Sequence, residues 1–287
     1  MADVFSKAVS ANATKNGSVV TTVGVTANYV SDQSRAISGV SENTLENKYD
    51  NSFDDPTYYG GGGLSRGLLA YYRFEETSGV RYNRGTIGGG LNLTDNNTVG
   101  STTGAVAIQG NPAVGASFVR GNSEYLSLSD PSEVNVGGAD FSISIWFKID
   151  SSLSGLNQNI LGVWQTSKFS YRLYYNGSNK KIFWYTSANG TSATSIASST
   201  VSDDTFYNTV LIHDNSSGSE VYLNNSSIGS AGSVVKSQPS VAFVVGGIAD
   251  GTDYFNGVLD DLAIWNRQIT SDEISQVYNS GSGKVLR

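Results

Sequence analysis

The sequence predicts an all-β protein, an antiparallel sandwich or barrel, with one short helix near its C-terminal end. Two observations carry this prediction. In Phe141–Ile149 apolar and polar residues alternate over nine positions, which is typical of a strand with one buried face. Short apolar segments then recur along the chain between turn pairs such as Asn176-Gly177 and Asp250-Gly251, a spacing that favours antiparallel strands over βαβ units.

Residues 1–66 differ from the rest of the chain. Val19–Tyr29 alternates as a strand does, but the residues after it are polar, and Gly60–Gly63 closes the segment. Such composition is typical of a flexible tail and linker. The alternative is an extended, β-rich anchor, because a segment too polar to form its own core needs the main domain or a partner to hold it. We favour the anchor, which divides the chain into residues 1–66 and a domain over 67–287.

The strands of that domain are expected in a regular series. Leu68–Phe74 is the first, and Ala116–Leu128 is expected to form a hairpin that turns at Arg120–Ser123. After Phe141–Ile149 we expect strands at Ile160–Trp164, Phe169–Tyr175, Lys181–Thr186, Thr205–His213, Glu220–Leu223, Val241–Val245 and Tyr254–Ile264.

The helix follows the last strand. Thr270 and Glu273 have the spacing of a capping box, in which each side chain accepts from the backbone of the other. Ile274, Val277 and Tyr278 then form one apolar stripe, and Gly281 is placed to end the helix.

Composition excludes several classes of function. The net charge of −7 argues against nucleic-acid binding, and the absence of cysteine excludes disulfides and thiolate chemistry. No apolar run approaches the roughly 20 residues of a membrane helix. The first residues lack the apolar core of a secretory signal peptide. These features favour a phage or bacterial product made without a signal peptide and placed on a virion or an extracellular surface.

Five segments together resemble, in order and spacing, the LamG-like jelly-roll family of the concanavalin A-like lectin/glucanase superfamily. They are LLAYYRFEETSG (68–79), FSISIWFK (141–148), EVYLNN (220–225), YFNGVLDDLAIWN (254–266) and ITSDEISQVY (269–278). The resemblance covers residues 68–281 and implies a two-sheet antiparallel jelly roll that binds glycans or proteins.

The resemblance also implies a structural Ca²⁺ between the loop after the first strand and the last strand. The matching positions are Glu75, Asn83 and Asp260, although the family favours Asp at the first two. Oxygen ligands from separate strands suit this cation. The alternative for Asp260 is a partner such as Arg84 or backbone N–H groups. Because neighbouring strand residues face opposite ways, Asp261 is expected to be an ordinary exposed acid.

Catalysis is not expected. Glycoside hydrolases need two carboxylates across the scissile bond, and hydrolases of this fold carry them on one strand as Glu-x-Asp-x-x-Glu, a spacing that this sequence lacks. Sugar rings stack on exposed aromatic side chains, and Trp146, Tyr174, Phe183 and Tyr185 are the candidates for such a surface. The alternative is that these rings only cover a sheet.

The sequence therefore favours a non-enzymatic, lectin-like binding or adhesion module. Residues 1–66 would attach it to the other proteins of a larger assembly, such as a capsid decoration or fibre on a phage virion, where it is expected to form a homo-oligomer. Its ligand would be a cell-surface glycan. The alternatives are a purely structural decoration or cement protein and, less favoured, a glycoside hydrolase.

Overall fold

The structure, a computed structural model, describes residues 63–85, 88–108, 111–130, 132, 134, 136–232, 235 and 239–286. The predicted strand at Val19–Tyr29 and nearly all of the anchor segment lie outside these residues. No helix in the described part of the chain is long and apolar enough to cross a membrane.

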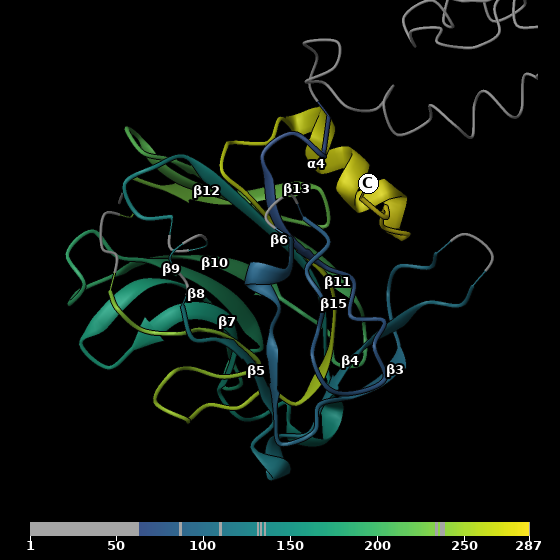
Figure 1. The fold of residues 1–287 in the computed structure, drawn as a ribbon. Helices are drawn as coiled ribbons and strands as arrows, with labels where there is room; N and C mark the ends of the chain where they lie inside the picture. Colours follow the sequence, from purple (N-terminus) through teal and green to yellow (C-terminus); the bar gives the residue numbers. More distant parts are fainter. Residues whose placement is uncertain are drawn as a thin grey trace, which may run out of the picture. The chain divides into compact units, whose positions relative to one another are not determined.

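The described residues form a jelly-roll sandwich of two antiparallel sheets, which confirms the predicted fold class (Figure 1). The eight-stranded sheet has the order β13-β12-β11-β6-β15-β4-β3, with β1 paired to β15. Its strands are β1 (Leu68–Tyr72), β3 (Gly100–Thr103), β4 (Val114–Phe118), β6 (Phe141–Ile149), β11 (Tyr207–Asp214), β12 (Gly218–Leu223), β13 (Ser226–Ala231) and β15 (Gly257–Trp265).

The seven-stranded sheet has the order β10-β9-β8-β7-β14-β5-β2. Its strands are β2 (Thr94–Asn96), β5 (Tyr125–Leu128), β7 (Gln158–Gln165), β8 (Lys168–Asn176), β9 (Lys181–Thr186), β10 (Thr194–Thr200) and β14 (Phe243–Val245). The main core lies between the two sheets. The alternation in β6 is confirmed there, because Phe141, Ile143, Ile145, Phe147 and Ile149 all belong to this core.

The predicted hairpin at Ala116–Leu128 is wrong. β4 pairs with β3 and β15 in one sheet, whereas β5 pairs with β2 and β14 in the other, so the chain crosses between the sheets here. The buried carboxylate of Glu124 fixes this crossing by accepting hydrogen bonds from Val119 N and Asn122 Nδ2, both at 2.8 Å. Turn residues in the sequence indicate a reversal of the chain but do not say which sheet it enters.

The helix α4 (Ser271–Tyr278) has the predicted capping box between Thr270 and Glu273. It lies on the face of the eight-stranded sheet that points away from the other sheet (Figure 1). Its apolar stripe joins a second buried cluster, formed by Leu64, Leu68, Tyr71, Val210, Ile212, Ala263, Trp265, Ile269, Ile274, Val277 and Leu286. The eight-stranded sheet is therefore covered on both faces in this region, and the seven-stranded sheet remains the candidate to present an open face.

Candidate functional site

Five aromatic side chains and one arginine gather on the outer face of the seven-stranded sheet. In β8, Tyr171, Leu173 and Tyr175 point into the core, so the alternating Arg172 and Tyr174 point outward. The register then sets Arg172 opposite Tyr185 and Tyr174 opposite Phe183 on β9. We call the group formed by Trp164, Phe169, Arg172, Tyr174, Phe183 and Tyr185 the aromatic surface.

The rings of the aromatic surface contact one another in a continuous series. Trp164 and Phe169 are stacked with centroids 4.2 Å apart, and Phe183 and Tyr185 are stacked at 5.9 Å. Tyr174 meets Tyr185 edge to face at 6.1 Å. Trp164 and Tyr174 are buried by these neighbours, whereas Phe169, Phe183 and Tyr185 are partly exposed. The exposed part of the surface is thus mainly aromatic ring.

The Arg172 guanidinium occupies the middle of the aromatic surface. Its central carbon lies 4.5 Å from the ring centroid of Trp164, 4.4 Å from that of Tyr174 and 4.9 Å from that of Tyr185. Each is a cation–π distance. Burial lowers the pKa of Arg172 and raises the pKa of Tyr174. The site is therefore a hydrophobic surface with one partly desolvated positive charge.

The structure brings together three of the four predicted ligand-binding residues, namely Tyr174, Phe183 and Tyr185. Trp146 does not join them. It lies on β6 of the other sheet and is only 3% exposed, because Tyr278 of α4 stacks on its ring at 5.9 Å. The expectation that Trp146 faces solvent or a ligand is corrected, since the sequence pattern did not show that the helix docks on that face.

Sequence reasoning missed Trp164, Phe169 and Arg172. Alternation in β7 and β8 could have placed Trp164 and Arg172 on the outer face. It could not have placed Phe169, which has the same parity as the core residue Tyr171. A register shift between Val163 and Trp164 brings Phe169 opposite Trp164.

Apart from the aromatic surface, a second candidate site is the pair of acidic residues Asp260 and Asp261 on β15. A register shift after Asp260 interrupts the pairing of β15 with β6, and Asp261 has a left-handed φ of 45°. This bulge removes the strict alternation, so both carboxyl groups are buried. The expectation that Asp261 is an exposed acid is therefore wrong; it is only 8% exposed.

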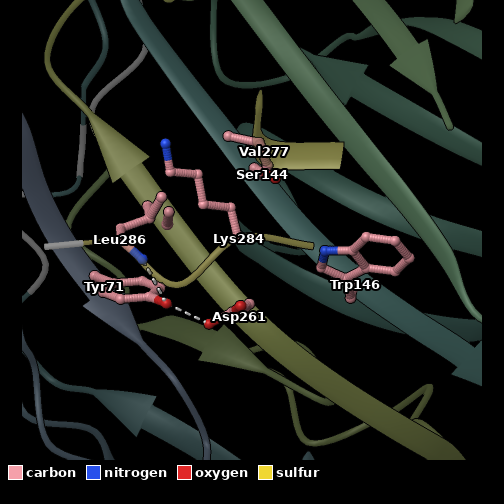
Figure 2. A pocket seen from close by; sticks show the side chains of 8 residues that line it. Tyr71, Ser144, Trp146, Asp261, Val277, Lys284 and Leu286 are labelled. Atoms are coloured by element: carbon pink, nitrogen blue, oxygen red, sulfur yellow. Dashed lines mark hydrogen bonds between the residues drawn. The ribbon is translucent and has the colours of Figure 1, made fainter. Parts of the chain in front are cut away.

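The two carboxyl groups have different partners. Asp260 accepts three backbone hydrogen bonds, from Ala105 N at 2.7 Å, Val106 N at 2.9 Å and Asp261 N at 3.0 Å. Asp261 Oδ1 accepts from the Tyr71 hydroxyl at 2.6 Å, and that hydroxyl accepts from Leu286 N at 3.1 Å (Figure 2). The other oxygen of Asp261 is buried and has no hydrogen-bond partner among the described residues.

Burial raises the pKa of Asp260 to about 7, and burial together with the neighbouring Asp260 raises the pKa of Asp261. Three N–H donors stabilise a negative charge on Asp260, so the proton of the pair resides on Asp261. Figure 2 shows the cavity beside Asp261, which has room for about one water molecule. Its lining residues are Tyr71, Ser144, Trp146, Asp261, Ala263, Val277, Lys284 and Leu286.

The three positions suggested for Ca²⁺ already have protein partners. Asp260 accepts the three N–H groups above, and Asn83 Oδ1 accepts from Tyr71 N and Gly85 N, both at 2.8 Å. Glu75 pairs with Arg73 at 2.8 Å. No group of three His, Cys, Asp or Glu suited to a metal ion occurs among the described residues. These oxygens are hydrogen-bonded or ion-paired within the protein, and calcium binding stays a prediction from the resemblance.

The two antiparallel sheets define a jelly-roll domain, and the aromatic surface lies on the outer face of one of them. A family model described as the concanavalin A-like lectin/glucanases superfamily matches residues 120–275, more than half of the chain, so the chain belongs to this family. No curated protein matches the chain.

The solved structures that share the fold include two binding domains and one arabinanase domain. The chain is 13% identical to the binding domain of Paraclostridial Mosquitocidal Protein 1, with a TM-score of 0.60, covering 76% of this chain and 53% of that one. The chain is 12% identical to the receptor binding domain of the botulinum neurotoxin C/D mosaic serotype, with a TM-score of 0.56, covering 75% of this chain and 52% of that one. The third structure is domain 4 of AbnA, a GH43 extracellular arabinanase from Geobacillus stearothermophilus, in complex with arabinotriose. The chain is 14% identical to it, with a TM-score of 0.53, covering 72% of this chain and 96% of that one. The chain thus spans about half of the toxin domains.

Proposed function

We propose that this chain is a non-catalytic glycan-binding module and that the aromatic surface holds the sugar. The observation that carries the proposal is the stacked, partly exposed pair Phe183 and Tyr185 beside Arg172. The C–H face of a sugar packs against aromatic rings, and its hydroxyl groups suit the guanidinium donors. Membership of the concanavalin A-like lectin/glucanases superfamily and the likeness to an arabinanase domain in complex with arabinotriose support this assignment.

The test is binding of the full chain to a broad glycan array. Tyr185→Ala and Phe183→Ala are expected to weaken binding to every recognised glycan by about tenfold or more, because each removes a stacking ring. Tyr82→Ala is the matched control: Tyr82 is 52% exposed and lies outside the aromatic surface. Native affinity in both ring variants, each confirmed as folded by near-ultraviolet circular dichroism, would remove the aromatic surface from consideration.

The absence of catalysis belongs to the same proposal. The neighbouring carboxylates Asp260 and Asp261 are buried and hydrogen-bonded within the protein, which does not suit attack on a substrate. Glu220 accepts from Ser227 Oγ at 3.0 Å on the other sheet, away from the aromatic surface. Release of reducing sugar from a bound glycan, abolished by Glu220→Gln, would show a hydrolase instead.

We also propose that the module is carried on a larger assembly, a phage virion surface, and that residues 1–66 attach it there as one copy of a homo-oligomer. The polar composition of that segment, which cannot form a core alone, supports this proposal. Purified virions are expected to bind the full chain but not a fragment of residues 67–287. If that fragment also bound no glycan, the alternative of a purely structural decoration protein would replace the lectin.

A further inference from the structure

Arg172 is a partly buried cation that forms no ion pair with a carboxylate of the described residues. None of the ion pairs within the described ranges includes it. Its Nη1 donates a long hydrogen bond of 3.3 Å to Asn159 Oδ1, and its buried Nε has no partner in the part of the chain that the structure describes. Asp253 acts on it electrostatically without forming an ion pair. The guanidinium therefore has donor capacity that the described residues do not use.

This arrangement leaves the guanidinium able to donate to a further acceptor. Removing a cation from water costs free energy that pairing normally offsets. The faces of Trp164, Tyr174 and Tyr185 offset part of this cost, but aromatic rings accept no strong hydrogen bonds from the guanidinium edge. A planar carboxylate or a sulfate fits that edge, because two parallel N–H···O bonds can form at once.

The position of Arg172 lets a ligand reach it. The side chain is partly exposed and adjoins the partly exposed ring of Tyr185. On the neighbouring strand β7 the residue opposite is Gly162, where a Cβ would come within 2.7 Å of Arg172 Cβ. The absence of a side chain at Gly162 makes room for the stem of Arg172 on the sheet, between the rings and within reach of a stacked sugar.

We propose that the aromatic surface binds an acidic sugar, whose carboxylate or sulfate pairs with Arg172 while its ring stacks on Tyr185 or Phe183. This inference rests on the proposed glycan-binding function and names the chemical class of its ligand. It also assigns separate tasks to the two parts of the site: the rings supply contact area, and the guanidinium selects for negative charge.

The experiment presents the full chain with matched glycan pairs that differ only in one group, such as oligogalactose and oligogalacturonate of equal length, or a glycan and its sulfated form. We expect the native chain to bind the acidic member about tenfold or more tightly. Arg172→Met, which keeps an apolar stem over the sheet, should bind both members equally, and Arg172→Lys should retain part of the preference.

A salt series on the native chain keeps the inference testable if the methionine variant does not fold. Raising the ionic strength from about 50 to about 500 mM should weaken binding of the acidic glycans and leave binding of the neutral glycans unchanged. Equal binding of both members by the native chain, or an unchanged preference in Arg172→Met, overturns the acidic-sugar inference and leaves glycan binding in place. Failure to bind any glycan overturns the inference together with the proposed function.

Discussion

Replacing Arg81 with methionine is expected to lower the free energy of unfolding by about 4 kcal/mol, because this change removes a fully buried guanidinium from the centre of a hydrogen-bonding network. Arg81 is 0% exposed. Its Nη2 donates to Val99 O at 2.6 Å and to Gly100 O at 3.1 Å, and Nη1 donates to Gly79 O. In the variant three carbonyl oxygens lose their donor, and that of Val99 is buried.

The measurement is urea unfolding of the full chain, followed by tryptophan fluorescence. Arg84→Met is the matched control, because Arg84 is only three residues away, its side chain is 47% exposed, and its ion pair with Glu76 spans 3.7 Å. Exposed pairs of this kind contribute about 0–1 kcal/mol. If the two variants unfold at the same urea concentration, the network around Arg81 does not stabilise the fold as we infer.

The same arginine illustrates a limit of sequence reasoning. An isolated Arg in a glycine-rich loop carries no periodic signal, so its burial depends on how residues 79–100 fold over it. The strands with strong alternation were predictable, since Phe141–Ile149 alone specifies one buried face. β10 and β13 were not predicted, because their sequences TSIASST and SSIGSA are mostly small and polar, and they pair at the edges of the sheets.

The candidate site was predictable to the extent that strict alternation holds. Strand alternation correctly places three ring residues on one face of the sheet: Tyr174, Phe183 and Tyr185. Trp146 also lies on the face that alternation predicts, but α4 packs over it. The packing of a helix on a distant strand cannot be read from the alternation of that strand. Phe169 and Asp261 do not follow the alternation, because each lies next to a register shift between paired strands. A one-residue bulge has no sequence signature here.

The second large effect concerns Asp261, where replacement with asparagine is expected to stabilise the protein at neutral and alkaline pH by about 2 kcal/mol. The pKa values of Asp260 and Asp261 both lie above the ordinary value of 3.8. The folded protein therefore holds more protons than the unfolded chain from about pH 4 upward. Stability from this pair is fully present below that pH and is lost as the pH rises through about 7.

Asp261→Asn removes the group that must ionise beside Asp260. The amide oxygen still accepts from Tyr71, the cavity beside Asp261 can hold a water for the amide N–H, and Asn tolerates the left-handed φ of 45° at least as well as Asp does. The difference in unfolding free energy between variant and native chain should be near zero at about pH 4 and should grow as the pH rises, because the pKa of Asp261 is raised in the folded protein. A difference that is constant with pH would contradict the shared proton.

The neighbouring change, Asp260→Asn, should have the opposite sign. Asp260 accepts three backbone N–H groups with its two oxygens, and an amide nitrogen in place of one oxygen would face a donor instead of accepting from it. We expect a loss of about 2 kcal/mol even at low pH. Urea unfolding of both variants is measured at several pH values, with the exposed Asp130→Asn as the reference. It tests whether Asp260 carries the charge of the pair and Asp261 carries the proton. If Asp260→Asn stabilises and Asp261→Asn destabilises, the two assignments must be exchanged.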